Sequence, residues 1–152
     1  MKKKTKTTLL LAALSAVALT GCNVSKSETT TYDVLGEKIE VKLDTSNNLS
    51  LSAQDGQFEV KDNSGNVIST GCFADEATYE YYYNIVTGSQ DYKEGSVNGN
   101  DYLYYEFGGH SGPEYNYLID ISNSDVYVIM GNVESEGSAK DVANSLSFSS
   151  KN

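Results

Sequence analysis

Three stretches decide the fold of this chain: DYLYYEF (Asp101–Phe107), YNYLIDIS (Tyr115–Ser122) and DVYVIMG (Asp125–Gly131). Val, Ile and Tyr dominate them, and these are the side chains that strands favour. Only Asn123 and Ser124 separate the last two stretches, and so short a connection requires an antiparallel pair. The sequence therefore predicts a β-meander here.

Upstream of the meander, the dominant hydrophobic period is also two. Ile39, Val41 and Leu43 alternate with charged residues, which predicts a half-buried strand. Leu49 and Leu51 indicate a short second strand. The remaining apolar runs, Phe58–Val60 and Val67–Phe73, predict the two strands of a hairpin, with Asp62–Asn66 as the turn between them.

A helix is predicted over Ala74–Thr87, with Asp75 as its N-cap and Gly88 just past its end. The long stretch from Gly88 to Asn100 has no apolar run and is expected to be a loop. A capping-box pattern at Ser138–Asp141 predicts a short C-terminal helix, after which Phe148 is expected to return to the core.

The mid-chain helix has apolar side chains on two sides. At 100° per residue, Ala74, Ala77, Thr78, Tyr81 and Ile85 share one sector, which we expect to face the core. The opposite sector carries Tyr79, Tyr82, Tyr83 and Val86.

The order of elements is strands, a helix, three strands and a helix. No regular alternation of strand and helix supports a parallel sheet, so the predicted class is α+β. We expect one antiparallel sheet of about six to seven strands with both helices packed on it. The meander that runs into a short helix and Ser145-Leu146-Ser147-Phe148 resembles the small domains of the PsbP/Mog1-like fold. That resemblance implies a non-catalytic binding or assembly protein at or near a membrane.

The first residues have the pattern of an export signal. Lysines precede Leu9–Thr20, an uncharged stretch that spans about 18 Å as a helix, well short of the roughly 30 Å hydrocarbon core. Leu19-Thr20-Gly21-Cys22 then resembles the lipobox of bacterial lipoproteins. The resemblance implies cleavage before Cys22, lipid on its sulfur and attachment to the outer face of the cell membrane. We expect residues 22–31 to be a lipidated tether and 32–152 to be a single domain.

The charge excludes several functions. Without residues 1–21 the chain has seven lysines against 21 acidic residues and no arginine, a formal charge of −14. Such a surface repels phosphate backbones, so we expect no nucleic-acid partner. One histidine and two cysteines do not supply a zinc site or a disulfide framework, so no metal or cofactor is expected, and the domain is predicted to be a monomer.

Two single residues, Cys72 and His110, have side chains capable of chemistry. Cys72 is expected to be a buried or half-buried thiol, since no nearby His or Lys would stabilise a thiolate. His110 lies in a Gly/Pro-rich connection between two predicted strands, where an exposed and dispensable histidine is expected. No catalytic residue is nominated.

Tyrosine is the one compositional excess. Eleven of the twelve tyrosines fall between Tyr79 and Tyr127. They serve either as packing in strands or as a recognition surface for a peptide, glycan or protein. If the surface exists, Tyr79 and Tyr83, with Tyr82, are its candidate residues, on the helix side away from the core.

Three functions remain open. The first is a surface-anchored, non-catalytic binding or assembly domain. The second is an immunity or sequestration lipoprotein directed against a cationic peptide, and the third is a hydrolase that depends on carboxylates. A flat aromatic and acidic face would favour peptide binding, and a deep pocket with converging acids and shifted pKa values would favour the enzyme. A featureless surface would leave the first function.

Overall fold

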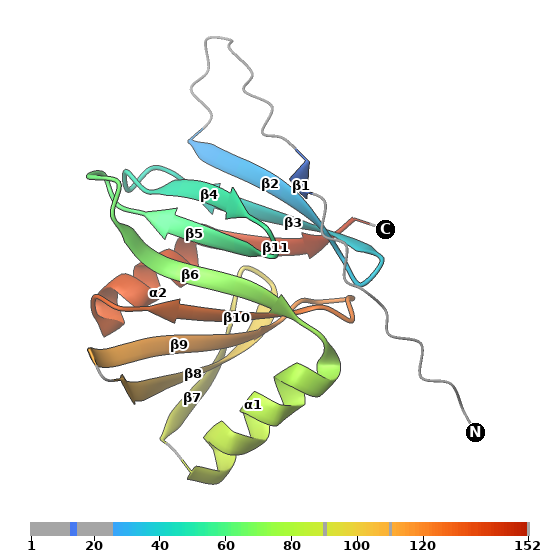
Figure 1. Ribbon diagram of the computed structural model, residues 1–152, viewed down its shortest axis with the longest axis vertical. Helices are drawn as coiled ribbons and strands as arrows, with labels where there is room; N and C mark the ends of the chain where they lie inside the picture. The colour runs from blue at the N-terminus through green and yellow to red at the C-terminus, as the bar shows by residue number, and fades with distance from the viewer. Residues whose placement is uncertain (1–12, 15–25, 90, 110, 152) are drawn as a thin grey trace.

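The computed structural model describes residues 13–14, 26–89, 91–109 and 111–151 (Figure 1). The fold is α+β, as predicted. The strands form two antiparallel sheets, so the prediction of a single sheet is wrong. The larger sheet has the order β4-β5-β6-β10-β9-β8-β7, and the smaller has the order β1-β2-β3-β11.

The larger sheet contains the predicted meander and hairpin. Its strands, in sheet order, are β4 (Ser50–Gln54), β5 (Gln57–Lys61), β6 (Val67–Ala74), β10 (Tyr127–Asn132), β9 (Gly112–Asp120), β8 (Asn100–Gly109) and β7 (Tyr92–Val97). Tyr127 pairs with Asp120, which confirms the antiparallel pair, although the connection is longer than two residues. The turn at Asp62 is confirmed, since its Oδ1 accepts hydrogen bonds from the amides of Ser64 and Asn66.

The smaller sheet forms around the predicted strand with Ile39, Val41 and Leu43, which is buried as expected. Its strands are β1 (Ala13–Leu14), β2 (Ser27–Val34), β3 (Glu37–Asp44) and β11 (Leu146–Ser150). Strand β2 occupies Ser27–Thr31, where a tether was expected. The polar SETTT sequence gave no apolar signal there, but threonine is β-branched and suits a strand.

The main core lies between the two sheets. Tyr32, Phe58, Ile119 and Phe148 belong to one buried cluster, so the prediction for Phe148 is confirmed. Helix α2 (Glu136–Ser145) contributes Ala139, Val142 and Ala143 to the same core. Its N-cap is Ser135, whose side chain accepts the amide of Ser138, so the helix begins earlier than the predicted capping box.

Helix α1 (Glu76–Ser89) covers the opposite face of the larger sheet (Figure 1). Asp75 is its N-cap, as predicted, and Oδ1 accepts the amide of Thr78 at 2.8 Å. The helix continues through Gly88, which was expected to lie beyond its end. The expected loop after it contains β7 instead, joined to β8 by Asn98-Gly99 with φ of 50° and 85°.

Candidate binding site between helix α1 and the β7–β8 hairpin

The side of helix α1 that packs against the larger sheet is the side that was expected to face outward. Val86 is 1% exposed and packs in a small core with Leu103 and Leu118. Tyr81 and Ile85, expected inside, are 62% and 42% exposed. Both sides of the helix carry apolar residues, so periodicity alone did not determine its rotation.

The three tyrosines proposed as a binding face now divide into two groups. Tyr79 is half-buried and stacks on Tyr127 of β10, with ring centroids 4.2 Å apart. Burial is the main cause that raises the pKa of Tyr79 to about 12. Tyr82 and Tyr83 remain 39% and 36% exposed. Tyr79 therefore contributes packing, and Tyr82 and Tyr83 offer accessible aromatic surface.

A cavity of about 280 Å³ lies beside Tyr79 and Tyr83. Strands β8 and β9 place Asp101 and Asp120 directly opposite each other in the sheet register. Strand β7 adds Glu94. The complete lining is Tyr79, Tyr83, Glu94, Gly95, Asp101, Tyr102, Leu103 and Asp120. The fold thus brings two of the proposed tyrosines together with three carboxylates, none of which the sequence had nominated.

The carboxylates interact unfavourably with one another. Burial, and secondarily the charge of Asp101, raise the pKa of the Asp120 carboxyl above its usual value. Like charges directly opposite each other on adjacent strands destabilise a sheet. A positively charged group in the cavity would relieve this repulsion.

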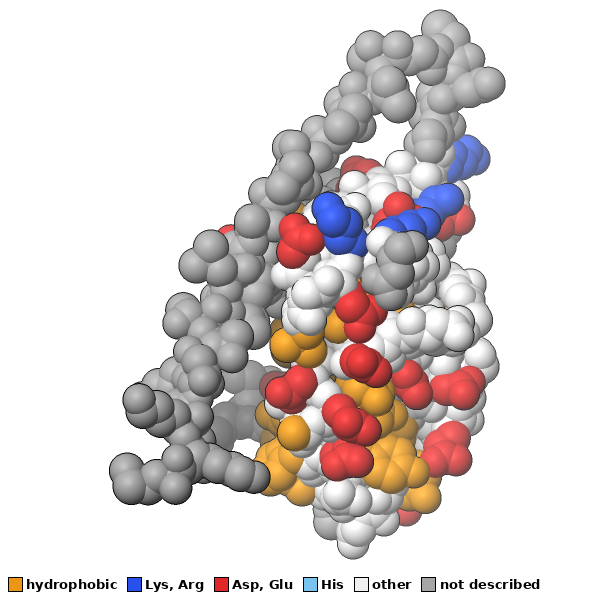
Figure 2. Space-filling view, turned by 90° about the vertical axis from the view of Figure 1, so that its right-hand side faces the viewer, with side chains coloured by type: hydrophobic (Ala, Val, Ile, Leu, Met, Phe, Trp, Pro, Cys, Tyr) orange, Lys and Arg blue, Asp and Glu red, His pale blue; other side chains and the backbone are white. Residues whose placement is uncertain are grey.

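The surroundings of the cavity are also acidic. Residues 75–127 include ten acidic residues against a single lysine, Lys93. On the face seen in Figure 2, red acidic and orange apolar side chains gather over the lower half, where α1 lies, and lysines appear only above them. This half of the domain therefore carries an excess of negative charge.

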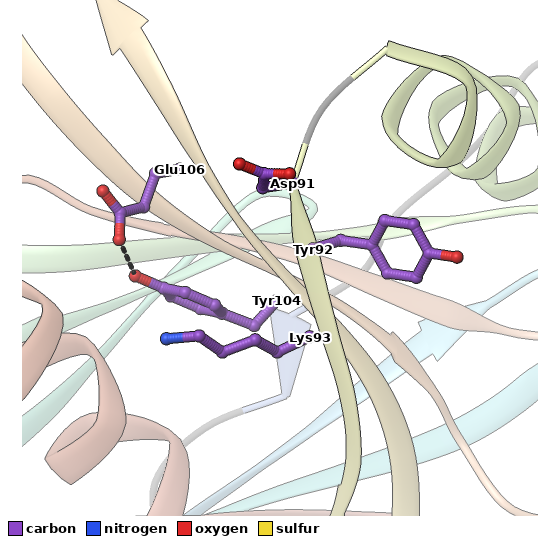
Figure 3. Close-up of a pocket in the computed structure, with 5 residues that line it drawn as sticks. All are labelled: Asp91, Tyr92, Lys93, Tyr104 and Glu106. Carbon is purple, nitrogen blue, oxygen red and sulfur yellow. Dashed lines mark hydrogen bonds between the residues drawn. The ribbon is translucent and has the colours of Figure 1, made fainter.

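A second hollow, of about 450 Å³, lies on the other side of β7 and is lined by Asp91, Tyr92, Lys93, Tyr104 and Glu106 (Figure 3). The hydroxyl of Tyr104 donates to Oε1 of Glu106 at 3.0 Å. Lys93 lies 5.2 Å from the centroid of the Tyr104 ring and forms an ion pair with Glu136 at 2.7 Å. Lys93, Tyr104 and Glu106 thus already have partners in the protein.

The other candidate residues lie elsewhere. Cys22 and His110 are outside the described residues. Cys72 is exposed, which corrects the prediction of a buried or half-buried thiol. It lies on β6, and desolvation by partial burial still raises the pKa of its thiol above the usual value. Within the described ranges, no group of three or more His, Cys, Asp or Glu side chains is arranged to hold a metal ion.

Neither α1 nor α2, the helices of the described part of the chain, is long and apolar enough to cross a membrane. No protein-family model, curated protein or solved structure matches this chain. The resemblances to bacterial lipoproteins and to the PsbP/Mog1-like fold therefore remain predictions from the sequence.

Proposed function

We propose that the protein is a lipid-anchored extracytoplasmic lipoprotein whose domain binds a positively charged partner without catalysis. The observation that carries the binding proposal is the cavity in which Glu94, Asp101 and Asp120 lie beside the ring of Tyr83. Carboxylates attract a cation, and an aromatic ring face adds cation–π stabilisation. Sequestration of a cationic peptide is one biological use of such a site.

The size of the cavity favours a side chain as its occupant. Its volume of about 280 Å³ lies below the roughly 300–1,000 Å³ typical of pockets that enclose small molecules. A lysine or arginine side chain with an extended stem needs less room. We therefore propose that the partner is a polypeptide with basic side chains.

The proposal is tested by replacing both opposed aspartates, Asp101→Asn together with Asp120→Asn. We expect binding of a lysine-rich peptide to weaken about tenfold or more and to lose part of its salt dependence, because two attractive charges are gone. Isothermal titration calorimetry at low and moderate salt measures both effects. Asp141→Asn on α2, at an exposed position away from the cavity, is the matched control.

The same double variant should be more stable than the wild type at neutral pH. The pKa of Asp120 is raised in the folded state, so the ionised Asp120 carboxylate destabilises the fold. This destabilisation is complete above the raised pKa and disappears as the pH falls below the ordinary pKa of aspartate. The gain in melting temperature should therefore vanish in acid. A double variant that binds the peptide as the wild type does would contradict the proposed site.

Membrane attachment is tested separately with Cys22→Ser. We expect the variant to move from the membrane fraction to the soluble fraction, because the lipid chains supply the anchoring free energy. Fractionation followed by immunoblotting measures the distribution. Retention of the variant in the membrane at the wild-type level would contradict the lipoprotein assignment, and Cys72→Ser serves as the control.

A carboxylate-dependent hydrolase is the second candidate. The observation that favours it is the pair formed by Asp101 and Asp120, of which Asp120 has a raised pKa, as a general acid requires. Release of nitrophenol from aryl glycosides by the wild type, but not by the double variant, would replace the binding proposal with this one.

A further inference from the structure

Strand β7 is an open edge of the larger sheet. It stands last in the strand order and pairs with β8 alone among the described strands. Because the turn between β7 and β8 has two residues, Val97 and Asn100 form a hydrogen-bonded pair. Hydrogen-bonded and non-hydrogen-bonded pairs alternate along an antiparallel ladder, so the N–H and C=O groups of Glu94 and Ser96 point away from β8. These groups can receive another strand.

Strand β4 is the opposite edge of the larger sheet, and its backbone groups also point outward at every second residue. At this edge one of the outward groups already has a partner. On β4 the outward amide of Leu51 donates to Oε2 of Glu28 at 2.5 Å. The Glu28 carboxylate on β2 thereby satisfies a backbone donor that an added strand would otherwise pair with. Edges left unprotected invite pairing with a further chain, and proteins commonly block them in such ways.

The β11 edge of the smaller sheet is also occupied. On β11 the carbonyls of Leu146 and Phe148 accept hydrogen bonds from the side chains of Asn98 and Asn100, at 2.6 and 3.1 Å. On its other side, β2 pairs with β1. On β7, by contrast, the outward backbone groups of Glu94 and Ser96 receive no recorded partner, whereas β4 and β11 each have at least one outward group occupied.

Strand β7 also has a hollow on each side. The acidic cavity with Tyr83 lies on the α1 side, and the hollow with Lys93 and Tyr104 lies on the other (Figure 3). A strand added to β7 would direct alternate side chains toward these two hollows. Backbone pairing and side-chain recognition would therefore occur together.

Building on the proposed function, we propose that the basic partner binds by β-strand addition, as an extended segment paired with β7. Charge complementarity identifies its chemistry. A residue opposite Glu94 points to the same face as Asp101 and Asp120, so lysine or arginine fits there. The intervening residues meet Lys93, which already has Glu136 as its partner, so uncharged side chains fit on that face.

The probe is a hexapeptide of alternating lysine and threonine, matched to the six residues of β7. Two N-methylated forms of this peptide are compared. In one the backbone nitrogen of every lysine is methylated, and in the other the backbone nitrogen of every threonine. Charge and side chains are unchanged, but each form loses one alternate set of backbone donors. In strand addition only one set faces β7, so one form should bind about tenfold more weakly than the other. Every described strand pair is antiparallel, so we expect the lysine-methylated form to lose affinity.

A protein variant provides the second arm. Ser96→Pro removes an outward donor of β7 and leaves the pairing with β8 in place, because proline is tolerated at such edge positions. We expect weaker hexapeptide binding and a cooperative thermal transition. The matched control is Ala53→Pro, an outward position on β4 far along the sheet from the cavity.

The outcomes separate the two proposals. Equal affinity of both N-methylated forms, with unchanged binding by Ser96→Pro, would overturn strand addition while the acidic cavity remains the binding site. Absence of binding by the unmethylated hexapeptide, under conditions where the wild type is folded, would overturn both proposals. Loss with one methylated form and with Ser96→Pro supports strand addition.

Discussion

Gly71→Val should lower the free energy of unfolding by about 3 kcal/mol, in the upper range for overpacked cores. A Cβ at this position would lie 2.1 Å from Cζ of Phe58, the residue paired with Gly71 across β5 and β6. Phe58 is fully buried between Phe73 and Phe148, with ring centroids 6.1 and 5.6 Å away, so its ring has no room to move. Urea denaturation followed by circular dichroism measures the loss.

The matched control is Gly88→Ala on helix α1. A Cβ there meets nothing within 4 Å, and alanine favours helix over glycine by up to about 1 kcal/mol. We expect a small stabilisation. Combining Gly71→Ala with Phe58→Leu should recover part of the loss caused by Gly71→Ala alone, because the two side chains compete for one volume. A Gly71→Val variant with wild-type stability would show that the ring does not lie over this glycine.

Tyr83→Ala should weaken binding of a lysine-rich peptide by about 2 kcal/mol, roughly thirtyfold, as expected for an aromatic residue at the centre of a binding site. Tyr83 lines the acidic cavity, and its ring stacks near Tyr79 at 6.0 Å. Tyr81 is the matched control because it is on the same helix but 62% exposed on the side away from the sheet. Fluorescence anisotropy with a labelled peptide measures both.

Both tyrosine variants should retain a cooperative thermal transition, since neither ring is part of the buried cores. Equal losses of affinity for Tyr81→Ala and Tyr83→Ala would place the partner on the outer side of α1. Unchanged affinity for Tyr83→Ala would remove the aromatic ring from the proposed site.

The fold class was predictable where hydrophobic alternation was strong. Ile39, Val41 and Leu43 are buried on β3, and the apolar run from Tyr115 became β9. Strand β7 was missed because Lys93, Glu94 and Gly95 have no apolar period on an exposed edge strand. The adjacent Asn98-Gly99 is, however, a strong local signal for a two-residue hairpin.

The division into two sheets depends on pairings between residues distant in sequence. β11 joins β3, and no local pattern indicated that pairing. The candidate site was predictable only in part for a similar reason. Tyr83 was nominated from composition, but Asp101 and Asp120 became neighbours only through the register of β8 and β9.

The pairing of β3 with β11 also has a kinetic consequence. Leu43 finds its partner in Leu146, about a hundred residues later, so a ribosome or a translocation channel must release the chain through β11 before the smaller sheet can close. Contacts of such long range slow folding. Until then the buried side of β3 lacks its final neighbour, whereas all pairings of the larger sheet lie within residues 50–132. A smaller sheet that closes only after β11 has emerged is compatible with passage through a membrane in an unfolded form, the route that the proposed lipoprotein would take.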